Sequence, residues 1–253
     1  MLNSFSSFCD DLYCDMYVNT ELDLPTERST ILTFFERLQR QYPSMADFGR
    51  RSDGAYCIEE NRDTGHYRWV AVEKDRIGSG LVNPRCREEA AAQHKLVLEL
   101  MPYMLGVSHL DVHSLDVTLA MDFDYAGNQD EVIAEALFSS SAFSCLIEPP
   151  YSRCINFSPV MVVNLSADCR TQARISVESR TGVYEPDTKS APAEGDPIGL
   201  SLTVRQYPSG QGTFDPVASF EYQCRTAEQL MAEKVIPCIV KPLINVIARK
   251  GLS

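Results

Sequence analysis

The sequence predicts an α+β fold of two similar β-α-β-β-β-α halves, which form a long curved antiparallel sheet with helices on one face. Two observations carry the prediction. Two segments about a hundred residues apart alternate strictly between apolar and polar residues. Each is followed by the same series, an apolar helical stripe, three strand-like runs and a second helix. The halves are 1–108 and 109–253, packed as one globular unit.

The first half begins with a strand over 12–24, because apolar residues recur there at every second position. Its apolar side carries Leu12, Cys14, Met16, Val18 and Leu22. Pro25 is expected to open a helix, since a proline at the first helical position loses no hydrogen bond. Pro43 is expected to end that helix.

Three strand-like runs follow, over 55–60, 66–73 and 76–83. Asn83 stands before a proline, which is typical of a helix cap followed by the first helical position. The apolar stripe of this second helix ends near Gly106, which predicts its C-terminus.

The same series then repeats. A strand is expected over 115–124, and a helix from about Asn128. Thr226, with Gln229 three residues later, has the pattern of a capping box at the start of the last helix. Three further strands are expected near 159–165, 171–180 and 198–207.

Two segments interrupt the repeat. Residues 139–157 form a connection that contains Pro149 and Pro150, and residues 181–197 are rich in proline, glycine and acids. The second segment is expected to be an exposed loop.

The halves align without gaps in two places. A shift of 101 residues places Asp15 on Asp116, and a shift of 105 places Glu73 on Glu178. Identity is low, so the matching order of elements carries the case for a duplication. The alternative is one α+β domain without internal symmetry.

This element order resembles the duplicated architecture of the TATA-box-binding-protein-like, or helix-grip, fold. The resemblance covers the order of elements across most of the chain and rests on no sequence motif. It therefore implies a shape and not an activity.

The face of the sheet opposite the helices mixes aromatic, acidic and basic residues, which favours a recognition surface. Tyr13, Asp15 and Asp116 belong to it by their alternation. The alternative is a polar sheet face with ordinary cross-strand pairs. We select as candidate residues for binding a ligand or a partner Tyr17, Tyr67, Trp69, Glu73, Arg174, Glu178 and Arg205.

Charge and composition limit the partners. The net charge of −12 disfavours nucleic acids and anionic membrane surfaces, because both repel acidic proteins. The sequence has no run of 18 apolar residues and no secretory signal at its N-terminus. Its nine cysteines are scattered and odd in number, which favours free thiols. The expected location is the cytoplasm.

A metal site is the weaker alternative for one segment. His109, Asp111 and His113 place three ligand-type side chains on one side of an extended stretch, but no fourth ligand stands nearby. The other interpretation is a loop that leads into a strand. Phosphate-binding, dinucleotide-binding, serine-nucleophile and zinc-protease motifs are absent, so no cofactor is expected.

Three functions follow from these patterns. The first is a non-enzymatic binding or scaffold protein, whose acidic and aromatic sheet face takes a protein partner or a second copy of the chain. The second is a module that binds a small molecule, with a cation as one candidate, between the halves, near Trp69, Glu73, Arg174 and Glu178. In this second model Glu73 and Glu178 face each other across a cleft. The third is an enzyme with an unfamiliar site.

Overall fold

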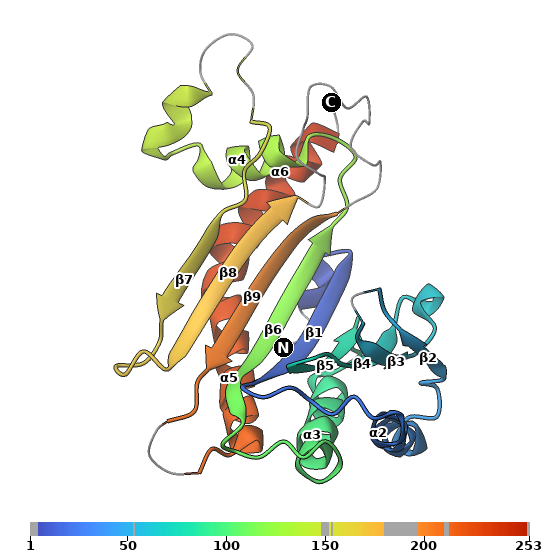
Figure 1. Ribbon diagram of the computed structural model, residues 1–253. Helices are drawn as coiled ribbons and strands as arrows, with labels where there is room; N and C mark the ends of the chain where they lie inside the picture. The colour runs from blue at the N-terminus through green and yellow to red at the C-terminus, as the bar shows by residue number, and fades with distance from the viewer. Residues whose placement is uncertain are drawn as a thin grey trace.

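The computed structural model describes residues 5–52, 54–147, 152, 154–179, 197–209 and 213–251. Within these residues nine strands form one antiparallel sheet in the order β2-β3-β4-β5-β1-β6-β9-β8-β7, with helices against it (Figure 1). The predicted α+β class and the antiparallel sheet are confirmed.

The strands are β1 Asp11–Thr20, β2 Asp47–Arg50, β3 Tyr56–Glu59, β4 Tyr67–Val72, β5 Arg76–Val82, β6 Val112–Phe123, β7 Val160–Asn164, β8 Thr171–Ser179 and β9 Ile198–Gln206. The α-helices are α2 Arg28–Gln41, α3 Arg87–Met104, α4 Gln129–Phe138, α5 Pro216–Leu230 and α6 Lys241–Gly251. A π-helix, η4 Met231–Val240, joins α5 to α6, and three short 3₁₀ turns cover Ser6–Phe8, Arg62–Thr64 and Ala142–Leu146.

Strands β1 and β6 pair at the centre of the sheet. Every second residue of β1 is buried, from Leu12 to Thr20, and the residues between them retain some exposure. The register places Asp15 opposite Thr118 and Tyr17 opposite Asp116. Because directly opposite residues share a face, apolar side chains of both strands lie on one side and polar ones on the other.

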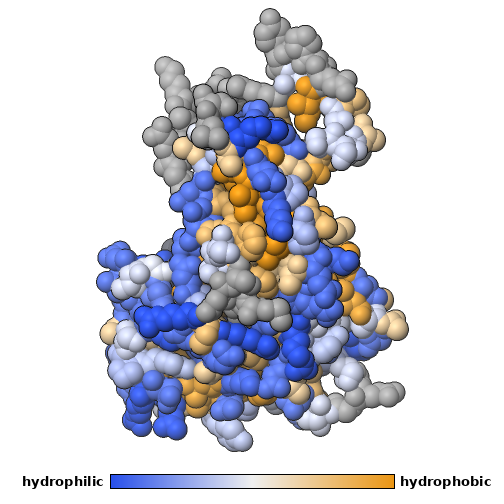
Figure 2. Space-filling view, turned by 180° about the vertical axis from the view of Figure 1, so that it is seen from behind, coloured by the Kyte–Doolittle hydropathy of each residue, from blue (hydrophilic) through white to orange (hydrophobic). Residues whose placement is uncertain are grey.

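The apolar side forms the core under the helices. Two clusters of buried residues make up this core, and β1 contributes Leu12 and Cys14 to one and Met16 and Val18 to the other. Figure 1 shows α5 and α6 behind strands β6 to β9. From behind, the molecule is largely hydrophilic with an apolar strip in its upper part (Figure 2). In the described ranges, no helix has both the length and the apolar content that a membrane crossing requires.

Most of the predicted strands agree with the structure, but the first half contains one strand more. The additional strand β2 covers Asp47–Arg50 and pairs with β3. All four of its residues are exposed, so burial imposes no alternation on its sequence. The first strand also ends at Thr20, before the predicted limit of 24, and Leu22 is 68% exposed.

Three helix starts differ from the prediction, those of α2, α3 and α5. Helix α3 begins at Arg87, because Asn83 adopts a left-handed φ of 50° and its side chain bonds Asp11 at 2.6 Å. Helix α5 begins at Pro216, ten residues before Thr226, with the Asp215 carboxylate accepting the first free N–H groups.

Helix α2 also starts later than Pro25 predicts, at Arg28, and ends at Gln41 just before Pro43. Gly106 has a φ of 71° after α3, as expected for a helix end. Helix α4 begins where predicted, and the side chain of Asn128 caps it by accepting the backbone N–H of Glu131.

The duplication of the halves stays a prediction. Outward from the central pair, the sheet continues with β5, β4, β3 and β2 on one side and with β9, β8 and β7 on the other. Strand β2 has no counterpart in the second half as described. The predicted loop 181–197 and the pair Pro149–Pro150 lie outside the described residues, apart from Pro197.

The two edges of the sheet differ in character. Edge strand β2 carries Asp47 and Arg50 in four residues. Edge strand β7 carries four apolar residues, Val160 to Val163, which are between 39% and 57% exposed. Charges on an edge strand oppose pairing with another chain, and β7 lacks them.

The exposed apolar edge predicts that the chain associates through β7 at high concentration, and we expect Val162→Lys to reduce this association, because a charge at an exposed edge opposes strand pairing. Light scattering over a concentration series measures the effect. Leu110→Lys is the matched control, since it replaces an apolar residue that is 81% exposed outside the sheet. An equal reduction in both variants would assign the effect to net charge alone.

Candidate functional site

The open face of the sheet, opposite the helices, gathers aromatic residues around one carboxylate. Strand β1 places Tyr13, Asp15 and Tyr17 on this face by alternation. Strand β4 adds Tyr67 and Trp69, which the register places opposite Val82 and Gly80 of β5. Gly80 in turn lies opposite Asp15, so Trp69 and Asp15 flank a position without a side chain.

Two glycines of β5 form the floor beneath these rings. A Cβ atom on Gly78 would lie 2.9 Å from Cζ3 of Trp69 and 3.1 Å from Cε1 of Tyr17. A Cβ atom on Gly80 would overlap Nε1 of Trp69 and Oδ1 of Asp15. The rings of Tyr17 and Trp69 therefore rest on bare backbone, with their centroids 6.0 Å apart.

The open face is hollowed beside these residues. The hollow has a volume of about 520 Å³. We call it the Asp15 hollow, and its lining includes Tyr13, Asp15, Arg51, Arg62, Tyr67 and Trp69. Tyr13, Asp15, Tyr67 and Trp69 come from β1 and β4, which both pair with β5, so backbone hydrogen bonds of the sheet fix this part of the lining.

Asp15 is the unpaired group of this hollow. The residue keeps some exposure at its edge, but its Oδ1 is enclosed, and no described residue donates a hydrogen bond to that oxygen. Burial raises the pKa of the Asp15 carboxyl to about 7, because low polarity disfavours the charged form. At neutral pH the carboxyl is therefore divided between its protonated and ionised forms.

Asp116, which aligns with Asp15, is fully paired. Arg205 donates from Nε to Oδ1 of Asp116 at 2.7 Å and from Nη2 to Oδ2 at 2.5 Å. Asn19 donates a further hydrogen bond to Oδ2 at 3.2 Å. The fork of the guanidinium matches the carboxylate, and these bonds raise the pKa of Arg205.

Arginines stack on the aromatic rings around the hollow. The guanidinium carbon of Arg51 lies 5.4 Å from the centroid of the Trp69 ring, and that of Arg62 lies 5.8 Å from the Tyr67 ring. Both arginines pair with Glu59, at 3.7 Å and 2.7 Å. The ring faces therefore already accept cations.

Arg76 makes the same arrangement at Tyr17. Its guanidinium carbon lies 5.0 Å from the ring centroid, and Glu73 pairs with it at 2.7 Å. Each of these arginines thus has a carboxylate partner other than Asp15.

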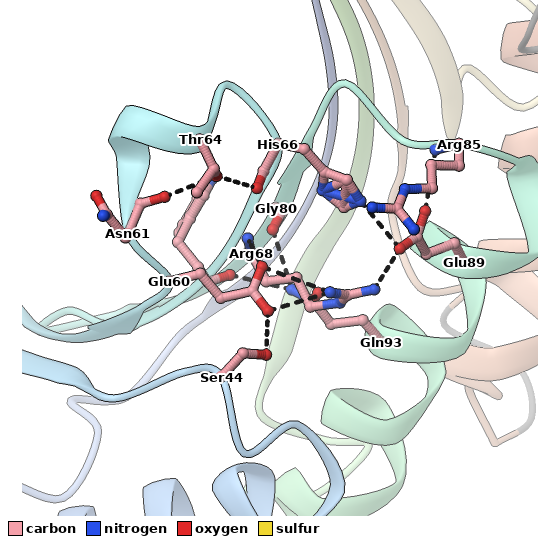
Figure 3. Close-up of polar contacts among 11 residues, drawn as sticks. Ser44, Glu60, Asn61, Thr64, His66, Arg68, Gly80, Arg85, Glu89 and Gln93 are labelled. Atoms are coloured by element: carbon pink, nitrogen blue, oxygen red, sulfur yellow. Dashed lines mark hydrogen bonds and ion pairs between the residues drawn. The ribbon is translucent and has the colours of Figure 1, made fainter.

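The helix side of the sheet holds β4 in place. Arg68 bridges two carboxylates, donating to Glu60 of the β3–β4 connection at 3.1 Å and to Glu89 of α3 at 2.5 Å (Figure 3). Glu89 also accepts from the backbone N–H of Arg85 at 2.9 Å and contacts His66 at 3.1 Å. Arg68 precedes Trp69, so this network fixes the strand that carries the indole.

Gln93 of α3 holds the same region from the helix side of the sheet. Its Nε2 has three acceptors within hydrogen-bond distance, which share its two hydrogens: the carbonyls of Trp69 at 3.1 Å and Gly80 at 3.0 Å, and Oγ of Ser79 at 3.0 Å. Helix α3 therefore holds both the strand with the indole and the glycine that faces Asp15.

The structure brings together some of the selected residues. Tyr17, Tyr67 and Trp69 lie in one group on β1 and β4, and Glu73 lies beside them through Arg76. Arg205 lies at Asp116, close to the centre of the open face.

Arg174 and Glu178 lie elsewhere, on β8. Arg174 shares a cross-strand row with Trp69, but β5, β1, β6 and β9 separate them, which is about 24 Å at 4.8 Å per strand. Glu178 lies opposite Gly199, in the row of Asp122 at the far end of the strands from Glu73. The predicted cleft in which Glu73 and Glu178 face each other is therefore wrong.

Two of the residues considered for a metal site, Asp111 and His113, contact the residues just after β1. Oδ1 of Asp111 accepts the backbone N–H of Leu22 at 2.9 Å, and Nδ1 of His113 contacts Glu21 at 2.7 Å. In the part of the chain that the structure describes, no group of three or more His, Cys, Asp or Glu residues is arranged to hold a metal ion.

Alternation placed Tyr13 and Asp15 on the open face, but neither was selected as a binding residue, and no sequence pattern pointed to Arg51 or Arg62. The sequence did contain a signal for Asp15. A carboxylate stands in the middle of one predicted strand, and two glycines, Gly78 and Gly80, stand in another. The pairing register of β1 with β5 was needed to bring the two together.

A scan of the chain against protein-family models and a search of curated proteins found no match. The function must therefore be inferred from the geometry of the open face.

Gly80→Ala is expected to destabilise the protein by roughly 1–3 kcal/mol, because the added methyl group displaces Trp69 and Asp15. Gly49→Ala is the matched control, since a Cβ atom there meets nothing within 4 Å. Urea unfolding measures both variants. Equal stability of the two would show that the ring and the carboxylate do not rest on Gly80.

Asp15→Asn is expected to stabilise the protein progressively more as the pH rises from 4 to 8. Burial raises the folded-state pKa to about 7 from the ordinary value of 3.8 for an aspartate, so the stabilising contribution of the protonated carboxyl is complete below pH 4. It is lost as the pH rises through 7, by at most roughly 4 kcal/mol, and an amide does not share that loss. Thermal unfolding of both proteins across this range measures the difference. A difference that stays constant with pH would contradict the buried, unpaired carboxyl.

Proposed function

We propose that this chain is a non-enzymatic binding protein that takes a partner on the open face of its sheet. The observation that carries the proposal is the group of Tyr13, Tyr17, Tyr67 and Trp69, four half-buried rings on a face that no described helix covers. Aromatic residues mixed with arginine are enriched where proteins bind one another.

The rings are held before any partner arrives. Tyr17 and Trp69 rest on the glycine floor, and Arg51 and Arg76 stack against them from the side. Side chains that are already ordered lose little entropy on binding, so more of the contact energy contributes to affinity. This supports a surface used for recognition.

The charge of the chain favours a basic partner. The net charge of −12 attracts cationic molecules and repels a second copy of the same chain. A protein partner with a basic surface is therefore a better occupant of this face than self-association. Nucleic acids are disfavoured for the same reason.

A binding role accounts for the open face better than catalysis does. Asp15 has a pKa suited to acid/base work. The neighbouring phenols of Tyr13 and Tyr17 do not, because burial raises their pKa values further from neutrality. Burial also raises the pKa of the Cys57 thiol to about 11. The contact between Ser79 and His94, at 2.9 Å, is enclosed beneath the sheet.

The proposed location is the cytoplasm. All nine cysteines are free thiols, and Cys14 is buried in the core, where burial raises its pKa. Such thiols suit a reducing compartment.

Tyr67→Ala is expected to lower capture of the binding partner by the immobilised chain at least tenfold, because it removes a ring from the centre of the proposed surface. Capture from native lysate with quantitative mass spectrometry provides the measurement. Tyr103→Ala on α3 is the matched control, since this tyrosine is 90% exposed on the helix side.

Two results would contradict the proposal. One is a partner whose capture survives Tyr67→Ala but not Tyr103→Ala. The other is a captured set that neither substitution changes, provided that circular dichroism shows both variants folded.

A further inference from the structure

Asp15 and Asp116 occupy neighbouring strands and aligned positions, but their cross-strand neighbours differ on both sides. On β6, Asp116 lies between Tyr17 of β1 and Arg205 of β9. On β1, Asp15 lies between Thr118 of β6 and Gly80 of β5. The strand position that supplies a guanidinium to Asp116 therefore supplies no side chain to Asp15.

The consequence is visible in the hydrogen bonds. Both oxygens of Asp116 accept from Arg205, at 2.7 Å and 2.5 Å. Oδ1 of Asp15 is enclosed and accepts from no described residue. Buried carboxylate oxygens are usually paired, and each exception needs an explanation.

From this contrast, and resting on the proposed function, we infer that the Asp15 hollow binds a guanidinium or ammonium group of the partner, which pairs with the Asp15 carboxylate as Arg205 pairs with Asp116. The hollow lies open to solvent next to the carboxylate, with a volume of about 520 Å³. A guanidinium or ammonium group can therefore reach the exposed edge of Asp15 from solvent without opening the sheet.

The walls of the hollow suit a cation. The rings of Tyr67 and Trp69 line the hollow, and the faces of aromatic rings attract cations. Arg51 and Arg62 already stack on these two rings from the rim, and Glu59 neutralises part of their charge. A ligand cation would pair with the carboxylate that these arginines leave unpaired.

An anion is the alternative ligand, because Arg51 and Arg62 share the single carboxylate of Glu59. An anion would lie at Arg51 and Arg62, and it would not need Asp15. The two ligand classes therefore differ in their dependence on the carboxylate and on pH.

Trp69 is the single tryptophan of the chain, so its fluorescence reports on the hollow. N-acetyl-arginine amide and N-acetyl-lysine amide are titrated against the full chain at pH 8 and constant ionic strength, with the neutral N-acetyl-citrulline amide as the isosteric comparison. We expect saturable changes with the two cations, with dissociation constants in the millimolar range. We expect none with the citrulline derivative.

Asp15→Asn is expected to weaken binding of the cations at least tenfold. Glu99→Gln is the matched control, because it removes one negative charge from an exposed position on α3 and should leave the dissociation constants unchanged. Binding by the natural chain should also strengthen from pH 6 to pH 8, since the cation competes with a proton for Asp15, and this trend should vanish in Asp15→Asn.

The inference is overturned if Asp15→Asn binds the arginine derivative as well as the natural chain does, if citrulline binds equally, or if only acetate and phosphate change the fluorescence. The proposed function fails separately. A partner that Tyr67→Ala loses and Asp15→Asn retains would refute the cation site alone. Cation binding without any partner that depends on Tyr67 would refute the protein-binding function and make a free amine the ligand.

Discussion

The antiparallel pairing of β1 with β6 is the constraint on which the rest of the structure depends. Their apolar side chains, such as Met16 and Val117, are buried under the helices. Because successive residues of a strand point to opposite faces, burial of one set forces the other into the open. Asp15 and Asp116 therefore lie on the open face because their neighbours are in the core. A slip of one residue in either strand would place carboxylates in the core.

The same alternation explains how much of the fold could be predicted from sequence. It is strong in β1 and β6, and there the predicted faces agree with the structure. It is absent in β2, whose four residues are all exposed, so nothing in the hydrophobic pattern marked that strand. The start of α5 was missed although Asp215 and Pro216 form a normal helix beginning, because the pattern at Thr226 and Gln229 resembles a cap equally well. Caps are local signals, and only packing decides which one is used.

The site was less predictable than the fold for a related reason. Alternation places Asp15, Trp69 and Arg174 on one face, but it does not give distances along a row of strands. The strand order β4-β5-β1-β6-β9-β8 separates Trp69 from Arg174, while the β1–β5 register brings Trp69 next to Asp15 across Gly80. Aligning the halves by a constant shift paired Glu73 with Glu178, yet equivalent positions in a repeat need not lie near each other.

The two central carboxylates show why an unpaired acid deserves a functional explanation. Asp116 is stabilised by Arg205, so its burial needs nothing further. Asp15 gains no such pair, and an asparagine would occupy the same volume without the free-energy cost of a buried charge. Structural stability alone therefore gives no reason for an ionisable group at this position. A ligand that carries the missing positive charge supplies one, because its binding would convert a destabilising carboxylate into half of an ion pair.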